Sequence, residues 1–497
     1  MTKTLSIDEV MARSGVAFGT SGARGLVSAM TDEVCFAYTA AFLQHLAGLG
    51  QFAAGRPVAI AGDLRPSTPR IMEACTAAIR HMGGRVVNCG HVPSPAVAAY
   101  GFAHNIPSLM VTGSHIPADR NGIKFNRTDG EVLKSDEQGI RGQTVLLPEI
   151  FDGEGGLRLF ERPGDVTDVV TPYVARYVDA FGPQALQGMR LGVYEHSAVG
   201  RDILTSLVRA LGGEAVPLGR SEQFIPVDTE AVRPEDQKLA REWAQTLKLD
   251  AILSSDGDSD RPLLADESGA WLRGDILGIL CAAGLGIEGV STPVSCNSAV
   301  ELSGLFKTVR RTRIGSPYVI ESMNDLLAEG YRTVCGYEAN GGFLLAAPAE
   351  IDGRKVAALP TRDAVLPMIT VLAEARRKDV KLSTMVAELP SRFTYSDRLQ
   401  NYATARSQAL LTRLQQGDLN LMLARLTKMF GSLAGAAVMV NTTDGLRVTF
   451  DTGEVIHLRP SGNAPELRCY TESASMQRAE RLAGEVLSLV ADTDCID

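Results

Sequence analysis

Residues 109–125 read LMVTGSHIPADRNGIKF, an apolar start followed by a Ser-His pair and, ten positions after the serine, a lysine. The leading apolar residues are typical of the end of a buried strand, and the Thr-Gly that follows favours a sharp exit from a sheet. The Asn121-Gly122 dipeptide predicts a tight turn. We therefore expect Ser114 at the mouth of a sheet, with His115 and Lys124 converging on it. A serine there is also common in a purely structural turn, because its hydroxyl bonds the nearby backbone.

Strand and helix patterns alternate along the chain before this segment. Helices are predicted to begin at Thr31, Thr68 and Ser94. Short apolar runs between them predict buried strands at residues 58–61, 85–88 and 108–111. Such alternation is the pattern of a parallel sheet wrapped by helices.

An internal repeat extends this pattern. Residues 78–90, AIRHMGGRVVNCG, resemble residues 207–219, LVRALGGEAVPLG, since both end a helix with Gly-Gly and continue into a strand. A strand at 190–194 and a helix at 201–211 surround the second copy. A third set begins at Gly274, with strands predicted at 293–296 and 332–335 and helices at 299–307 and 321–328. We therefore expect three similar α/β units.

The last part of the chain has a different pattern. Three short strands separated by Asp-Gly and Thr-Gly turns are predicted at 436–441, 446–450 and 455–458, and a helix at 476–490. The predicted fold is three related α/β domains with mixed, mostly parallel sheets, plus a C-terminal α+β domain, around a central cleft. The expected domains are residues 1–165, 166–272, 273–388 and 389–497.

Composition narrows the class of protein. The chain has 497 residues with 49 basic and 58 acidic side chains, a formal net charge of -9, which argues against a general nucleic-acid binder. Its eight cysteines are scattered without paired short spacings, which favours reduced thiols over a metal or disulfide framework. We find no apolar signal-peptide core and no run of membrane-spanning length. A cytoplasmic enzyme is expected.

Residues 256–262, DGDSDRP, place three carboxylates at alternate positions after a predicted strand. Carboxylate oxygens spaced in this way can turn toward one hard cation. An EF-hand loop counted from Asp256 would place Glu267 at its twelfth position, but its sixth position holds Arg261 in place of glycine. The sequence therefore favours an open cation site, most plausibly for Mg²⁺, over a calcium loop. The alternative is a solvated acidic turn.

Three further loops combine groups that bind oxygen-rich ligands. Residues 18–25, FGTSGARG, offer backbone N–H groups, hydroxyls and a guanidinium to an anion, but lack the Gly-Lys-Ser/Thr ending of a P-loop. Residues 336–343, GYEANGGF, set a carboxylate and an amide between glycines, as neighbouring sugar hydroxyls require. Residues 459–468, RPSGNAPELR, have the composition of a phosphate clamp. Residues 63–67, DLRPS, are a weaker signal. Plain glycine turns are the alternative for the first two loops.

These segments occur in the order typical of one family. The sequence resembles, over essentially its whole length, the α-D-phosphohexomutases, which include phosphomannomutases and phosphoglucomutases. The resemblance implies that Ser114 carries a phosphoryl group and that Asp256, Asp258 and Asp260, with the phosphoserine, bind Mg²⁺. It implies that Lys124 and His115 assist proton transfer at the sugar hydroxyl, and that Arg24 and Arg261 flank the transferred phosphoryl group. The implied sugar contacts are Glu338 and Asn340, and the contacts to the other phosphate are Arg459, Ser461, Gly462, Asn463 and Arg468.

Five positions depart from the common family pattern. Ile116 stands where many members have asparagine, Asn340 where serine is usual, Gly342 where many have histidine, and Asn463-Ala464 where Thr-Glu is common. Gly342 and Ala464 alter the expected sugar contacts. None of the five removes the groups that the resemblance assigns to phosphoryl transfer.

The resemblance implies an enzyme that interconverts hexose 6-phosphate and hexose 1-phosphate through a hexose 1,6-bisphosphate. The expected ligands are small sugar phosphates, mannose phosphate first and glucose phosphate second, with no nucleic-acid or membrane partner and a monomer or homodimer. A phosphoglucosamine mutase is one alternative. A serine hydrolase using Ser114 and His115 is another, although adjacent residues on an extended chain point apart and no G-x-S-x-G elbow is present. A non-catalytic binding relative is a third.

Overall fold

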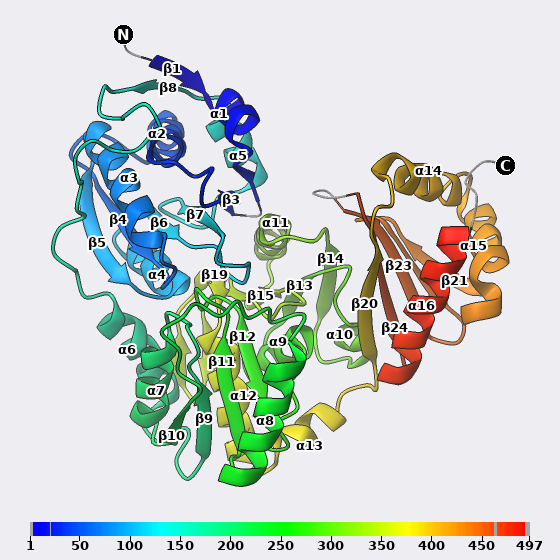
Figure 1. The fold of residues 1–497 in the computed structure, drawn as a ribbon. Coiled ribbons are helices and arrows are strands. Elements are labelled where there is room, and N and C mark those ends of the chain that lie inside the picture. The colour runs from blue at the N-terminus through cyan, green and yellow to red at the C-terminus, as the bar shows by residue number, and fades with distance from the viewer. Residues whose placement is uncertain (1–2, 20, 462–464, 493–497) are drawn as a thin grey trace. The chain divides into compact units, whose positions relative to one another are not determined.

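The computed structural model describes residues 3–19, 21–461 and 465–492 (Figure 1). The chain divides into two compact units. The first unit comprises residues 1–290 and 315–386, and the second comprises residues 291–314 and 387–497. Within the described ranges, no helix combines the length and the apolar character needed to cross a membrane. The seven described cysteines are all buried and form no disulfide with one another.

The first domain of the first unit is built on a six-stranded sheet of order β2-β3-β7-β6-β4-β5. Strand β4 runs parallel to β5 and β6, whereas β7 is antiparallel to both β6 and β3. A separate pair, β1 and β8, is antiparallel. The strands are β1 (Lys3–Ser6), β2 (Ala17–Phe18), β3 (Gly22–Leu26), β4 (Pro57–Gly62), β5 (Arg85–His91), β6 (Ser108–Val111), β7 (Arg120–Asn126) and β8 (Thr144–Leu147).

Helices cover this sheet and bury a continuous core. Thr31 caps the longest of them by accepting a hydrogen bond from the Val34 N–H at 3.3 Å. The stacked rings of Phe42 and Phe125, 4.7 Å apart, join that helix to β7. The helices are α1 (Ile7–Ser14), α2 (Asp32–Gly48), α3 (Thr68–His81), α4 (Ser94–Ala103) and α5 (Lys134–Arg141).

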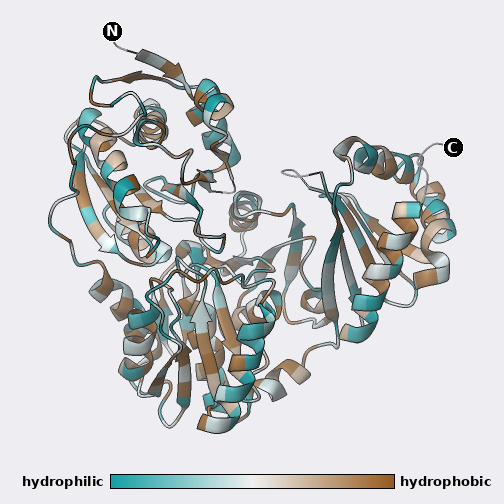
Figure 2. Cartoon of the chain, viewed as in Figure 1, coloured by the Kyte–Doolittle hydropathy of each residue, from teal (hydrophilic) through white to brown (hydrophobic). Residues whose placement is uncertain are grey.

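The second domain repeats the design with a four-stranded sheet of order β10-β9-β11-β12. Strand β9 is parallel to β10 and β11, and β12 is antiparallel to β11. Figure 2 shows that β11, every residue of which is buried, is largely apolar, whereas α8 carries many hydrophilic residues. The elements are α6 (Val170–Phe181), β9 (Arg190–Tyr194), α7 (Arg201–Ala210), β10 (Glu214–Leu218), α8 (Pro234–Leu247), β11 (Ala251–Ser255) and β12 (Pro262–Ala265).

The chain then continues through the first unit with α9 and the antiparallel neighbours β15, β16 and β19. A small hairpin, β17 and β18, precedes β19. The elements from α9 to α13 are α9 (Gly274–Gly284), β13 (Gly289–Pro293), α10 (Ala299–Leu302), β14 (Thr308–Thr312), α11 (Ser316–Ala328), β15 (Val334–Tyr337), β16 (Phe343–Leu345), β17 (Ala349–Ile351), β18 (Arg354–Val356), β19 (Leu359–Asp363), α12 (Val365–Lys378) and α13 (Leu382–Ala387).

The second unit contains an antiparallel sheet of order β20-β24-β23-β22-β21, which agrees with the predicted α+β pattern. Buried residues of α15 and α16, such as Phe430 and Val486, belong to the same core as the sheet. The elements α10 and β14, given above in chain order, belong to this unit. Its further elements are β20 (Phe393–Leu399), α14 (Thr404–Leu414), α15 (Leu419–Ala434), β21 (Ala437–Asn441), β22 (Leu446–Phe450), β23 (Val455–Pro460), β24 (Leu467–Ser473) and α16 (Met476–Asp492).

The tight turn predicted at Asn121-Gly122 is wrong, since both residues lie inside β7. The chain reverses earlier, where the Ile116 N–H bonds the Gly113 carbonyl and the Arg120 N–H bonds the Pro117 carbonyl. A Cβ on Gly122 would lie 2.6 Å from the Ala23 carbonyl oxygen. Glycine is therefore required there by the close approach of β3 and not by a turn.

Three elements predicted between residues 293 and 335 have the wrong boundaries. The strand predicted at 293–296 is β13, which ends at Pro293, because the Cys296 N–H turns back to the Pro293 carbonyl at 3.0 Å. The helix predicted at 299–307 ends at Leu302, two residues before Gly304, whose φ of 64° lies in the left-handed region. The strand predicted at 332–335 is β15, which lies two residues later.

Candidate active site

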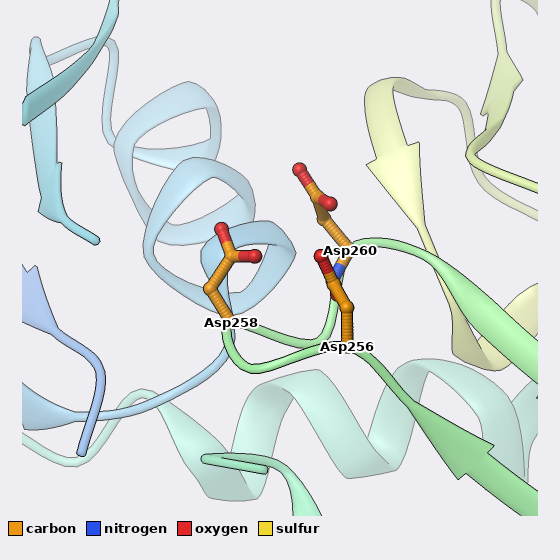
Figure 3. Close-up of side chains that lie close together, drawn as sticks. All are labelled: Asp256, Asp258 and Asp260. Carbon is orange, nitrogen blue, oxygen red and sulfur yellow. The ribbon is translucent and has the colours of Figure 1, made fainter. Parts of the chain in front are cut away.

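Three aspartates meet in the loop between β11 and β12. The oxygens of Asp256, Asp258 and Asp260 lie within 4.8 Å of one another, and all three residues are buried (Figure 3). The loop holds its shape because Asp256 Oδ1 accepts hydrogen bonds from the backbone N–H groups of Asp260 and Arg261, at 3.3 and 3.2 Å. A single short loop thus concentrates three carboxylates in one buried space.

This cluster fits a cation. Burial and the charges of the two neighbouring aspartates raise the pKa of Asp256 well above its usual range. Asp258 Oδ1 and Asp260 Oδ1 are buried without a hydrogen-bond partner among the described residues. Buried oxygens of this kind are costly unless they are paired or coordinate a metal, and carboxylates are the ligands that hard cations prefer.

Ser114 lies directly against the aspartate loop. Its Oγ donates to Asp256 Oδ2 at 2.6 Å, and its N–H donates to Thr112 Oγ1 at 2.7 Å. The residue is fully buried, and its backbone φ of 55° is uncommon for a residue other than glycine. A Cβ on Gly257 would lie 2.7 Å from the Ser114 carbonyl oxygen, so glycine permits the two loops to approach each other.

Arg65, which lies in the weakly informative segment 63–67, holds the Ser114 loop in place. The guanidinium donates to four loop carbonyls, those of Ser114 at 2.9 Å, Ile116 at 2.6 Å, Pro117 at 2.7 Å and Arg120 at 3.0 Å. Its Nε pairs with Asp63 Oδ2 at 3.1 Å, and both side chains are fully buried. Arg65 contacts the backbone carbonyl of residue 116, so the contact is the same for isoleucine as for asparagine.

Lys124 reaches the same loop from β7. Its Nζ lies 2.5 Å from both Asp258 Oδ2 and Asp260 Oδ2. Ser94 at the start of α4 also donates to Asp258 Oδ2, at 2.5 Å. Although burial works in the opposite direction, the contacts from Lys124 and Ser94 lower the pKa of Asp258.

His115, Arg24 and Arg261 complete the group on one side of Ser114. Arg261 Nη1 lies 2.7 Å from His115 Nδ1, and Ser114 Oγ lies 3.3 Å from the same nitrogen. Burial and the charge of Arg261 lower the pKa of His115 to about 3, so the imidazole is neutral and its Nδ1 accepts from the arginine. Burial and the same arginine lower the pKa of Arg24 to about 10.

A small cavity of about 40 Å³ adjoins Arg24, Lys124 and Arg261. Gly22 on its wall has no room for a side chain, because a Cβ there would lie 1.9 Å from the Ile123 carbonyl oxygen. Close contact between β3 and β7 therefore explains one glycine of the first loop. The cavity is lined by Gly19, Ser21, Gly22, Ala23, Arg24, Thr112, Ile123, Lys124, Arg261 and Arg362.

The predicted sugar loop lies between β15 and β16 in the same unit. The Gly342 N–H donates to Asn340 Oδ1 at 2.9 Å, and Thr229 donates to the Asn340 carbonyl at 2.7 Å, so the asparagine shapes the loop. Glu338 is buried, and burial raises its pKa. The structure connects this loop to the aspartates through Arg362, which the sequence analysis did not select.

Arg362 stands at the end of β19 with 3% of its side chain exposed. Its Nη2 donates to Ser21 Oγ at 3.0 Å, and its Nε lies 3.2 Å from Asp260 Oδ2. Glu131, also missed, accepts hydrogen bonds from Ser21, Ser316 and Thr361 and lies 3.6 Å from Arg362 Nη2. Both residues sit outside the glycine-rich loops that guided the sequence analysis.

The predicted phosphate loop belongs to the second unit. Arg459 Nε donates to Asp444 Oδ1 at 2.8 Å, and Arg459 pairs with Arg468 across β23 and β24. The Ser461 N–H donates to the Glu466 carbonyl at 2.9 Å. Gly462 and Asn463 lie outside the described residues, as does Ala464.

Comparison with known families gives matches along most of the chain. Residues 15–145, 172–269 and 273–393 match the models for phosphoglucomutase/phosphomannomutase alpha/beta/alpha domains I, II and III, and residues 419–489 match the C-terminal domain. The predicted boundaries at 165, 272 and 388 stay predictions.

Proteins of similar length are similar to this chain in sequence. A phosphomannomutase of Salmonella muenchen is 44% identical over 484 residues, which cover 97% of this chain and 96% of the relative. A phosphomannomutase of Sinorhizobium fredii is 42% identical, covering 96% and 99%. A phosphoglucosamine mutase of Saccharopolyspora erythraea is 28% identical, covering 95% and 98%.

Solved structures share the fold. A phosphoglucomutase/phosphomannomutase family protein of Burkholderia thailandensis aligns with a TM-score of 0.73 at 20% identity, covering 95% of this chain and 97% of that one. The N-acetylphosphoglucosamine mutase of Aspergillus fumigatus, solved with GlcNAc-6P and magnesium, aligns with a TM-score of 0.58 at 14% identity, covering 98% and 99%.

Proposed function

Because the chain belongs to the phosphoglucomutase/phosphomannomutase family, we propose that it interconverts hexose 6-phosphates and hexose 1-phosphates through a phosphorylated Ser114. The observation that carries this proposal is the contact of Ser114 Oγ with Asp256 Oδ2, at 2.6 Å, inside a buried cluster of three aspartates. Arg24, Arg261 and Lys124 line the adjoining cavity. A nucleophilic oxygen beside a cation site and several cations is what phosphoryl transfer requires of a protein.

In the proposed reaction the phosphoryl group passes from Ser114 Oγ to a free hydroxyl of the hexose phosphate. The serine P–O bond breaks, a P–O bond to the sugar oxygen forms, and a hexose 1,6-bisphosphate results. The bisphosphate then turns, and its other phosphoryl group returns to Ser114. Arg24 and Arg261 would neutralise charge on the transferring oxygens.

The sugar hydroxyl must lose its proton during the transfer. We assign that proton to Lys124 Nζ, with His115 as its neighbour in the site. This role requires Lys124 Nζ, which lies 2.5 Å from the carboxylates of Asp258 and Asp260, to lose a proton to solvent before the transfer.

Mg²⁺ is the proposed metal, held by Asp256, Asp258, Asp260 and the phosphoserine, where it would neutralise phosphoryl charge. For the sugar, Glu338 and Asn340 are the proposed hydroxyl contacts. Arg459, Ser461, Gly462, Asn463 and Arg468 are proposed for the phosphate that is not transferred. A cytoplasmic location and a monomer or homodimer stay predictions.

Mannose phosphate is the proposed first substrate, with glucose phosphate second, because the relatives at 42–44% identity are phosphomannomutases. The phosphoglucosamine mutase quoted above reaches only 28%. A serine hydrolase is disfavoured because the Ser114 hydroxyl donates to Asp256, while His115 Nδ1 is engaged by Arg261.

The test begins with the phosphate itself. Incubation with a hexose 1,6-bisphosphate and Mg²⁺ should add the mass of one phosphoryl group to the intact protein, and Ser114→Ala should abolish both this gain and mutase activity. Turnover of mannose, glucose and glucosamine 1-phosphates, each primed with bisphosphate, ranks the sugars. Normal mutase activity in Ser114→Ala, or labelling of the wild type by a fluorophosphonate, would overturn the proposal.

A further inference from the structure

Arg362 and Glu338 face each other across a gap in the first unit. Arg362 Nη1 lies 4.0 Å from Glu338 Oε2, which is beyond hydrogen-bond distance. Glu338 Oε2 is buried with no hydrogen-bond partner in the part of the chain that the structure describes. A buried guanidinium donor and a buried carboxylate acceptor are thus close but not joined.

The other nitrogens of Arg362 fix the direction of the guanidinium. Nη2 donates to Ser21 Oγ at 3.0 Å, and Nε lies 3.2 Å from Asp260 Oδ2, without the alignment of a hydrogen bond. Because the group is planar, anchoring Nη2 and Nε determines where Nη1 points. Arg362 also lines the cavity beside Lys124 and Arg261.

The path of Arg362 depends on Gly342. A Cβ built on Gly342 would lie 2.9 Å from both Cγ and Cδ of Arg362, and 3.2 Å from Asn340 Oδ1. The φ of Gly342 is not in the left-handed region, so its backbone does not require glycine. The absence of a side chain at position 342 therefore leaves room for the Arg362 side chain, and we expect substitutions at the two positions to have coupled effects.

A hydroxyl group can accept one hydrogen bond and donate another. Such a group placed between Nη1 and Oε2 would bridge the guanidinium and the carboxylate, which lie 4.0 Å apart. We propose that Arg362 and Glu338 together bind one ring hydroxyl of the hexose phosphate, and that Gly342 provides the space through which Arg362 reaches it. The inference rests on the proposed mutase function, and it makes Arg362, which lies in β19 outside the predicted sugar loop, a substrate-binding residue.

The test compares one enzyme pair on a series of sugars. Arg362→Met and the wild type are assayed for kcat/KM on mannose 1-phosphate and on its 2-, 3- and 4-deoxy analogues. If Arg362 binds a hydroxyl, Arg362→Met lowers kcat/KM about 10- to 100-fold on the parent sugar but less than about 3-fold on the analogue lacking that hydroxyl. Equal losses on all four sugars would overturn the inference, because a purely structural effect does not depend on one hydroxyl.

A second pair tests the role of Gly342. Gly342→Ala alone should lower kcat/KM on the parent sugar about 10-fold, since its methyl group displaces Arg362. In an Arg362→Ala background, which lacks both atoms that the methyl group meets, the same change should be smaller than about 3-fold. Strictly additive effects would show that the two positions act independently, contrary to the proposal.

Two controls separate the possible failures. Arg70→Met removes an arginine that is ion-paired with Asp32 outside the cavity, and it should leave the pattern across the four sugars parallel to that of the wild type. Arg362→Lys keeps a positive charge beside Asp260 and Glu131, so it supplies the same comparison if Arg362→Met does not fold. A wild type that turns over no hexose phosphate and takes up no phosphate on Ser114 refutes the proposed function itself, whereas an active wild type without hydroxyl-specific losses refutes only the inference.

Discussion

At the scale of single residues, Arg65 shows how one buried side chain determines the geometry of a loop. Its guanidinium donates to four carbonyls of the segment that carries Ser114, and it stacks over the Phe224 ring at 4.0 Å. Asp63, its partner, also accepts hydrogen bonds from Thr68 and Thr112. The hydrogen bonds of Arg65 and Asp63 therefore stabilise the left-handed backbone conformation of Ser114.

Replacing Arg65 should separate loop geometry from loop chemistry. We expect Arg65→Met to lower the free energy of unfolding by about 3–5 kcal/mol, because it leaves Asp63 buried without its charge partner. Arg65→Met/Asp63→Asn should recover part of that stability, but the phosphorylation of Ser114 should remain at least about 10-fold slower than in the wild type. Urea unfolding and the rate of mass gain with hexose 1,6-bisphosphate measure the two effects. Full recovery of both in the double variant would show that the carbonyl contacts are unimportant.

Residues of this kind mark the limit of prediction from sequence. Ser114, Lys124 and the three aspartates could be selected because their side chains stand in short segments of unusual composition. Arg65 gave a weak signal because its partners are backbone carbonyls about 50 positions away, which carry no sequence signature. Arg362 and Glu131 were not predicted, because the local sequence does not distinguish a charged residue in a buried ion pair from one on the surface.

At the scale of elements, the site depends on two loops that approach each other through glycine. The β11–β12 loop touches the Ser114 loop at Gly257, where a Cβ would lie 2.7 Å from the Ser114 carbonyl and 3.1 Å from the Phe224 ring. Gly257→Ala should therefore push the aspartates away from Ser114 while leaving both sheets intact.

We expect Gly257→Ala to slow phosphorylation of Ser114 about 10- to 100-fold, since small displacements of reacting groups have large effects on rate. Gly130→Ala is the matched control, because its Cβ would meet no atom within 4 Å and its φ is not in the left-handed region. Intact-mass kinetics with hexose 1,6-bisphosphate give both rates. Equal rates in the two variants would contradict the role assigned to this contact.

The elements also show which sequence patterns are reliable. Strands β6 and β9 begin and end where the apolar runs predict, because each run fills one buried strand. The Asn121-Gly122 prediction failed because the Asn121 amide donates to Ser67 and Thr68 and Gly122 admits the neighbouring strand β3, so tertiary contacts use a turn-like dipeptide inside a strand. Local turn preference cannot reveal a neighbour that is distant in sequence.

At the scale of the whole molecule, each of the two units contains a buried neutral histidine. His196 Nε2 lies 2.8 Å from the Ser255 carbonyl, and His457 Nε2 lies 2.7 Å from the Asp444 carbonyl. The Nδ1 atoms of both are buried without a partner among the residues that the structure describes. Burial lowers the pKa of each imidazole to about 4, although the carbonyl contact acts in the opposite direction.

This arrangement makes the free energy of unfolding fall as the solution is acidified. Between about pH 6.5 and pH 4 the unfolded chain binds a proton at each histidine and the folded chain does not, so stability rises with pH in that window and is lost as pH falls through it. The loss is roughly 3 kcal/mol for each histidine by pH 4.

Both tryptophans, Trp243 and Trp271, belong to the first unit, so their fluorescence reports the unfolding that His196 affects. We expect His196→Asn, which tolerates the φ of 27° at this position, to flatten the fluorescence-detected dependence of unfolding free energy on pH between 6.5 and 4.5, relative to the wild type. Carboxylates titrate equally in both proteins, so the difference between the two curves isolates the histidine. Parallel curves would show that His196 is protonated to the same extent in the folded and unfolded chains, and that its buried position does not affect acid stability.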